Sequence, residues 1–370
     1  MTAITPIVMP KWGLSMKEGT VNAWLVQEGD RIRVGDAILE VETDKITGAV
    51  EAGDPGILRR KVASPGQTLP VKALLGVMAE ADVLDRDIDA FIAAYVVPIA
   101  AESSGEGEGE SAHRFVDVDG IRVRYARHGG RGPTVLLIHG FGGDLDNWLF
   151  NIDALAEAGT VVALDLPGHG QSERRLPGTT LADLAGFVTH FMDTLRVEQA
   201  HLVGHSMGGA IAAQMACEHP GRVESVALVA SAGLGDEINT GYTEGFVSAQ
   251  SRRELKPIVE QLFADPDLVT RQLLDDLLRY KRLDGVTELL GALGGRLFAH
   301  GTQREQPGRR LPTGTRVLAV WGAEDRIIPA GHARNAPASA RVAVLEGAGH
   351  MVQMEKPRQV NSLLQQHVAG

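Results

Sequence analysis

The stretch "AHLVGHSMGGAIAAQMACEH", residues 200–219, decides the fold of the larger part of the chain. Its apolar start predicts a buried strand, and its alanine-rich end predicts a helix. Between them lies Ser206, in a G-x-S-x-G string whose glycines let the strand and the helix approach without a Cβ clash. A serine held in such a strained strand-to-helix turn is a candidate nucleophile.

Similar apolar, β-branched runs recur on both sides of this stretch. They end in Gly, His or Asp and read "TVLLIHG", "VVALDLPGHG", "VESVALVAS", "TRVLAVWG" and "ARVAVLEGAGH". Helical patterns lie between most of them, which is typical of buried parallel strands joined by helical crossovers. Residues 234–310 break the alternation and read as helices with loops. We therefore expect an α/β domain over residues 113–370, with residues 234–310 as a helical cap.

A serine nucleophile needs a base and an acid that orients the base. In this type of fold the acid precedes the histidine in the chain, and both follow strands. "WGAEDRIIP" supplies Glu324 and Asp325 after one strand, and "EGAGHMVQMEKP" supplies His350 after the next. Three other histidines precede the acid in the chain and are read as turn or loop structure: His139, His169 and His205.

A glycine-rich turn, "HGFGGD" at residues 139–144, follows another apolar run. Such a turn leaves backbone N–H groups free, and those of Phe141 and Met207 could bind a developing oxyanion. The alternative is an ordinary packing turn. The order of the remaining parts favours the oxyanion hole.

Residues 115–368 resemble an α/β-hydrolase throughout, including "DLPGHGQS" at Asp165–Ser172. The resemblance implies a catalytic set of Ser206, Asp325 and His350. It favours Asp325 over Glu324 because Asp325 matches the G-x-x-D pattern of that family. We find no metal-ligand pattern in the chain.

The N-terminal residues 3–80 are different, with short β-patterns broken by glycines at regular intervals, which predicts a small all-β domain. In "EVETDKITGAV", residues 40–50, two alternating arms meet at Asp44-Lys45. Such a pattern predicts a hairpin with Lys45 exposed at its tip. A solvated turn lysine would look the same when taken alone.

The surroundings of Lys45 resemble a lipoyl domain over about eighty residues. The E-T-D-K motif stands at Glu42–Lys45, and Gly35 and Gly56 stand where that family places glycines. Biotin-carrying domains share the fold but set the lysine between methionines, so the resemblance implies covalent lipoate on Lys45. Ile46 is a mild departure, since alanine is more common there.

Residues 81–112 connect the two domains. "DRDIDAFIAAYVVP" predicts one short helix that ends before Pro98. "AESSGEGEGESA", residues 101–112, has no apolar residue larger than alanine. A segment of this composition cannot bury enough surface to offset its ordering entropy, so it predicts a flexible acidic linker.

Composition sets limits on the function. The chain has 370 residues, a net charge of −11 and a pI near 5.6, which argues against a nucleic-acid binder. One cysteine, Cys217, excludes an intrachain disulfide and is read as an inert core residue. No signal peptide or membrane-length apolar run is visible, so we expect a cytoplasmic protein that does not bind membranes.

The combination of a lipoyl domain and an α/β-hydrolase resembles the acetyltransferase component of bacterial acetoin dehydrogenase complexes. The resemblance implies transfer of acetyl from the lipoyl arm to coenzyme A (CoA). It also implies a thiamine-diphosphate-dependent acetoin dehydrogenase component (E1), a dihydrolipoyl dehydrogenase (E3), a lipoylating enzyme and a homo-oligomer as partners.

Two other functions remain open: a lipoyl carrier with a non-catalytic, partner-binding hydrolase fold, and an esterase or thioesterase. For transfer, the cap would have to exclude water and admit a thiol. Basic residues of the cap could contact CoA phosphates, or simply form solvated helix faces: Arg252, Arg253, Lys256, Lys281 and Arg282.

Overall fold

The computed structural model describes residues 4–12, 16–43, 47–97, 113–130 and 132–370. The chain divides into two units, residues 1–110 and 111–370. Each has its own hydrophobic core.

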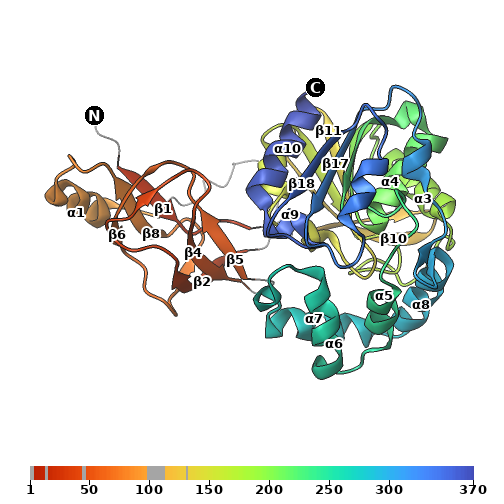
Figure 1. The fold of residues 1–370 in the computed structure, drawn as a ribbon, viewed down its shortest axis with the longest axis horizontal. Coiled ribbons are helices and arrows are strands. Elements are labelled where there is room, and N and C mark those ends of the chain that lie inside the picture. The colour runs from red at the N-terminus through yellow and green to blue at the C-terminus, as the bar shows by residue number, and fades with distance from the viewer. Residues whose placement is uncertain (1–3, 13–15, 44–46, 98–112, 131) are drawn as a thin grey trace. The chain divides into compact units, whose positions relative to one another are not determined.

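The N-terminal unit consists of two four-stranded antiparallel sheets and one helix (Figure 1). One sheet has the order β1-β8-β6-β3, with bounds Thr5–Val8, Leu74–Ala79, Gly56–Lys61 and Arg31–Ile32. The other has the order β5-β4-β2-β7, with bounds Thr47–Glu51, Ala37–Glu42, Glu18–Trp24 and Thr68–Pro70. Alternate apolar side chains, such as those of Val21, Leu39 and Leu58, are fully buried between the strands. This pattern is that of a small sandwich.

Strands β4 and β5 form the hairpin that the sequence predicts. They pair antiparallel, and Glu42 lies opposite Thr47 at the end of the ladder. The connection between these two residues contains Lys45, which lies outside the described residues. Helix α1, Asp85–Ala94, packs on the sheet through Ile88, and the Tyr95 hydroxyl donates to the Lys72 carbonyl at 2.8 Å. The helix therefore belongs to the N-terminal unit.

The C-terminal unit is built on one eight-stranded sheet of order β18-β17-β14-β13-β11-β12-β10-β9. Six neighbouring strands are parallel: β18 (Arg341–Leu345), β17 (Val317–Gly322), β14 (Val223–Val229), β13 (Ala200–His205), β11 (Thr134–Ile138) and β12 (Thr160–Leu164). At one end of the sheet, β10 (Ile121–His128) and the edge strand β9 (Arg114–Val118) run antiparallel to their neighbours. Strands β11 to β14 are mostly apolar because helices cover both of their faces.

Two pairs of helices cover this sheet (Figure 1). Helices α3, Leu181–Thr194, and α4, Met207–Glu218, pack together on one face. On the other face lie α2, Ile152–Ala156, and α10, Pro357–Ala369. The strand order moves outward from β11 to β12 and then back to β13, so right-handed crossovers place α2 and α3 on opposite faces.

Between β14 and β17 the chain forms the cap. Four helices gather there, apart from those that cover the sheet (Figure 1): α5 (Thr240–Ser248), α6 (Arg252–Val259), α7 (Arg271–Lys281) and α8 (Val286–Leu297). A small hairpin of β15 (Phe298–Ala299) and β16 (Thr302–Gln303) closes the insertion. Tyr280 of α7 donates to the Gly168 carbonyl at 2.7 Å and ties the cap to the sheet domain.

Candidate active site

The turn between β13 and α4 holds Ser206 in a strained conformation. Its φ of 53° and ψ of −120° lie outside the regions that L-residues favour. A Cβ on Gly204 would collide with the Gly208 carbonyl, and one on Gly208 would collide with the Ile138 carbonyl. Both glycines are therefore required for the crossing of strand and helix. Ser206 is buried and lies at the carboxyl end of the central strand.

Asp325 and His350 meet after the last two parallel strands, β17 and β18. Asp325 follows β17, His350 follows β18, and Asp325 Oδ2 lies 2.8 Å from His350 Nδ1. The other carboxylate oxygen of Asp325 accepts the N–H groups of Ile327 and Ile328, at 2.8 and 2.9 Å. Both side chains of this hydrogen-bonded pair are almost completely buried. Asp325 is thus fixed by its own loop in a position to orient the imidazole.

Glu324, the competing acid, has a different environment. It accepts the N–H groups of Gly347 at 3.1 Å and Ala348 at 2.9 Å, and these hydrogen bonds hold its pKa below the ordinary value for a glutamate. Glu355 similarly accepts the Gly349 N–H at 2.7 Å. These carboxylates hold the loop that leads to His350. The sequence contains no local signal for the role of Glu324, because its partners lie 23 and 24 residues further along the chain.

The glycine-rich turn after β11 lies beside the serine. A Cβ on Gly140 would press on the Ser206 Cβ at 2.9 Å. Phe141 follows Gly140, and Met207 is the first residue of α4. Among the described residues neither backbone N–H has an acceptor. Both groups are available as donors next to the candidate nucleophile.

Ser206 and His350 line one enclosed pocket of about 60 Å³. Their side chains share this pocket without a direct hydrogen bond between them. Its remaining walls come from the turn after β11, from Asn147, His205 and Met351, and from the cap. Sequence reasoning did not identify the four cap residues: Tyr242, Phe246, Leu262 and Leu277. The volume is sufficient for a small acyl group or a few water molecules.

The other three histidines form structural hydrogen bonds. His139 Nε2 lies 2.9 Å from the Leu166 N–H that donates to it, and His169 Nδ1 lies 3.0 Å from the Pro167 carbonyl. His205 Nε2 lies 3.0 Å from the carbonyl of His350. Burial lowers the pKa of all three, that of His169 to about 4. These imidazoles stay neutral and hold the loops around Ser206.

Two sequence expectations about single residues were wrong. Lys281, grouped above with exposed basic residues, is buried; its ammonium donates to the Ala249 carbonyl and lies 5.3 Å from the centre of the Phe246 ring. Burial lowers the pKa of Lys281. Cys217 is only half-buried, on the side of α4. In both cases the packing of the segment after β14 decides the exposure, and local sequence does not encode it.

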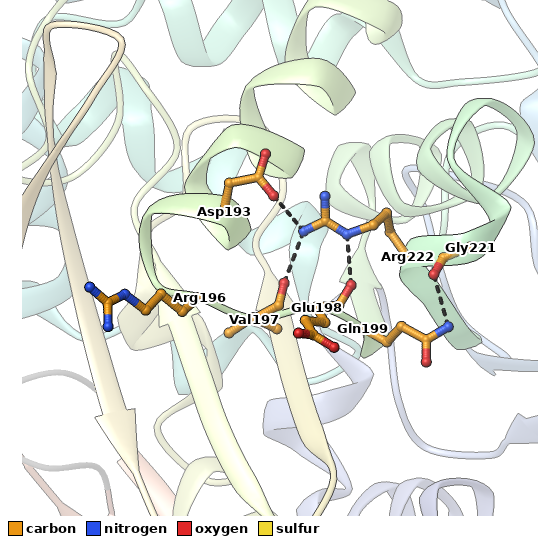
Figure 2. Close-up of a pocket in the computed structure, with 7 residues that line it drawn as sticks. All are labelled: Asp193, Arg196, Val197, Glu198, Gln199, Gly221 and Arg222. Atoms are coloured by element: carbon orange, nitrogen blue, oxygen red, sulfur yellow. Dashed lines mark hydrogen bonds and ion pairs between the residues drawn. The ribbon is translucent and has the colours of Figure 1, made fainter.

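A separate hollow of about 690 Å³ lies at the amino ends of the parallel strands, before β13 and β14. Figure 2 shows that Arg222 is engaged there by Asp193 at 2.7 Å and by the carbonyls of Val197 and Glu198. Arg196 points away from this cluster (Figure 2). The polar groups hold two loops together, and no candidate catalytic residue lies among them.

The family comparisons agree with this division. Residues 133–357 match the family model described as alpha/beta hydrolase fold, and residues 5–78 match the model described as biotin-requiring enzyme. A membrane phospholipase A has a similar structure, with a TM-score of 0.62 and 27% identity, over 70% of this chain and 86% of that one. The class is therefore an α/β-hydrolase-fold protein that carries a biotinyl/lipoyl-type domain, which confirms the predicted fold.

Two relatives cover almost the whole chain. Both are named as the dihydrolipoyllysine-residue acetyltransferase component of an acetoin cleaving system. The Cupriavidus necator protein is 67% identical over 99% of this chain and 98% of its own length. The Pseudomonas putida protein is 50% identical over 98% of this chain and 97% of its own. The chain belongs to this family of acetyltransferase components, as its sequence predicts.

Within the part of the chain that the structure describes, no helix is long and apolar enough to cross a membrane.

Proposed function

We propose that the chain is the acetyltransferase of an acetoin-cleaving system and transfers acetyl from a lipoyl arm on Lys45 to CoA through an acyl-Ser206. The observation that supports the proposal best is the shared pocket, where Ser206 and His350 meet. Residues 3–80 would be the carrier domain, 81–112 the connection and 113–370 the transferase. The relatives named above support acetyl as the acyl group.

The N-terminal unit fits a lipoyl group. The β4–β5 ladder ends at Glu42 and Thr47, so Lys45 lies in a short connection between two paired strands. A lysine in such a connection is a substrate that a lipoylating enzyme could modify. When bound, lipoate carries the acetyl group as a thioester on a dithiol arm.

The first half of the reaction uses the residues of the pocket. His350 accepts the proton of Ser206 Oγ as this oxygen attacks the carbonyl carbon of the thioester donor. Asp325 holds the imidazole in the correct tautomer and stabilises its charge. The N–H groups of Phe141 and Met207 stabilise the oxyanion. The C–S bond then breaks, the proton passes from His350 to the departing sulfur, and acetyl remains on Ser206.

The second half reverses these steps with a different thiol. His350 accepts the proton of the CoA thiol, and the sulfur attacks the acetyl carbonyl. The Ser206 ester bond breaks, and the serine recovers its proton. Water competes at about 55 M, so transfer requires that the cap positions the thiol and excludes water. Tyr242, Phe246, Leu262 and Leu277 form the cap wall that would do this.

One assay tests the proposal. The full chain is given acetyl-dihydrolipoamide with and without CoA, and acetyl-CoA and acetate are measured. We expect acetyl-CoA to be the main product when CoA is present. Acetate formation that CoA does not suppress would identify a thioesterase. A Ser206→Ala variant with normal acetyl-CoA formation would leave only a carrier or scaffold role for the hydrolase fold.

The relatives' names place them in a multi-component system. We propose the corresponding partners for this chain: a thiamine-diphosphate-dependent component that loads acetyl, a dihydrolipoyl dehydrogenase that reoxidises the arm, a lipoylating enzyme and further copies of the chain.

A further inference from the structure

We propose that an arginine-lined groove between α6 and α7 binds the phosphate groups of the thiol acceptor CoA. The groove has a volume of about 690 Å³. Its lining residues are Ser251, Arg252, Asp275, Arg279 and Arg282, with the leucines at 278 and 283. The inference rests on the proposed function, because it names where the acceptor of that reaction is held.

The charge of the groove is the opposite of that of the molecule. Three arginines and one aspartate line it, whereas the whole chain has a net charge of −11. Ser251 is the N-cap of α6, so the positive end of this helix dipole also lies at the groove wall. A cationic hollow in an acidic protein selects an anionic ligand.

The arginines retain donors for such a ligand. Arg252 contacts Asp275 through Nε at 3.1 Å, and Arg279 contacts Asp276 through Nη1 at 2.6 Å. The Arg282 guanidinium has no ion pair or hydrogen bond with any residue that the structure describes. Each guanidinium has five N–H donors in a planar fork that matches a phosphate. The groove thus offers Arg282 and the remaining donors of its two neighbours.

The position of the groove suits a long acceptor. Leu277 and Leu278 are neighbours on α7, and the first lines the Ser206 pocket while the second lines the groove. The two sites therefore lie on different sides of one helix, which is about 10–12 Å across. The pantetheine arm of CoA is longer than this width. Phosphates held in the groove would allow the thiol to reach over α7 to the acylated serine.

Direct binding tests the groove independently of catalysis. We would measure binding of CoA, dephospho-CoA, pantetheine and inorganic phosphate to the full chain by calorimetry. Arg282→Gln and Arg252→Gln should each raise the Kd for CoA about tenfold or more, because each removes a charge-assisted contact. The Kd for dephospho-CoA should rise less in these variants, and the Kd for pantetheine should not change. Arg196→Gln, which removes an exposed arginine from the hollow at the opposite strand ends, is the matched control.

Steady-state kinetics gives a second readout. The two variants should raise the KM for CoA with little change in kcat, and should leave both the KM for acetyl-dihydrolipoamide and turnover with pantetheine unchanged. Unchanged CoA binding in both variants overturns the proposal. An equal loss of pantetheine binding in these variants, or an equal loss of CoA binding in Arg196→Gln, also overturns it.

A higher KM for an acetylated N-terminal domain, with normal CoA binding, would also overturn it and would assign the groove to the carrier. If CoA binds in the groove but only acetate is formed, the proposed transferase function fails and the groove stands.

Discussion

At the scale of single residues, two adjacent acids have separate roles in the proposed site. Asp325 faces the imidazole of His350. Glu324 instead accepts N–H groups from the loop that leads to His350. Sequence order alone left both acids open, since they are consecutive residues. After β17 the two side chains point in different directions, and this difference gives the two acids different roles. The spacing of residues in the sequence does not specify these directions.

The triad prediction follows from this geometry. Ser206→Ala should lower kcat for acetyl-CoA formation by about 10⁴-fold or more, and Asp325→Asn by about 10³- to 10⁴-fold, because the imidazole loses its orienting charge. Glu324→Gln keeps an acceptor for the loop and should lower kcat by less than about tenfold. Steady-state assays with acetyl-dihydrolipoamide and CoA would measure kcat for all three variants. Equal losses in the two acid variants would contradict the assignment of Asp325.

The buried histidines predict a pH dependence of stability. Burial depresses the pKa of His169 from 6.5 to about 4, so between these values the unfolded chain binds a proton that the folded chain does not. The stability that His169 contributes is present above pH 6.5 and is lost as the pH falls toward 4, by up to about 3 kcal/mol.

Urea unfolding between pH 7 and pH 4.5 would measure this loss. His169→Asn keeps a donor for the Pro167 carbonyl without a titratable ring, so its stability should depend less steeply on pH. The exposed His300→Asn should follow the wild-type curve. An unchanged slope in His169→Asn would contradict the prediction.

At the scale of elements, the strands of the sheet could be predicted from the sequence. Which cap residues are buried could not. The apolar runs before His139, Ser206 and Asp325 each form a parallel strand, because continuous burial demands continuous apolar sequence. In the cap, amphipathic helices can turn the same residues outward or inward. Lys281 is buried against Phe246 for this reason, although its charge predicts exposure.

The cap predicts the acyl selectivity of the pocket. Phe246 is buried, and its ring packs near those of Phe141 and Tyr242 at centroid distances of 6.4 and 6.0 Å. Phe246→Leu should enlarge the pocket and raise the rate with a butyryl donor relative to an acetyl donor by about tenfold or more. Phe246→Ala would cost about 3–5 kcal/mol of stability, so leucine is the better substitution.

Competition between the two thioester donors measures this ratio. Phe191→Leu, an equally buried change in α3, is the control and should leave the ratio unaltered. A ratio that stays at the wild-type value in Phe246→Leu would show that Phe246 does not limit the acyl group.

At the scale of the whole molecule, the two units should be separable in function. Lys45→Arg keeps the charge but removes the amine that lipoate would modify. The variant should lose transfer from the acetoin-cleaving component entirely, while acetyl transfer from free acetyl-dihydrolipoamide to CoA stays normal. Intact mass should show a lipoyl adduct in the wild type expressed with a lipoylating enzyme and none in the variant. An adduct that persists in Lys45→Arg would place the arm elsewhere.

The backbone at Ser206 restricts the evolution of this site. Serine and threonine interchange freely at many positions, but a φ of 53° with a ψ of −120° crowds a β-branched side chain more than an unbranched one. Threonine is therefore a poor replacement nucleophile at this position, although its hydroxyl has the same chemistry. Cysteine, unbranched and of similar size, is a nucleophile that the turn would accept. The geometry of this one turn thus favours, in any descendant of this protein, a nucleophile whose side chain is unbranched at Cβ.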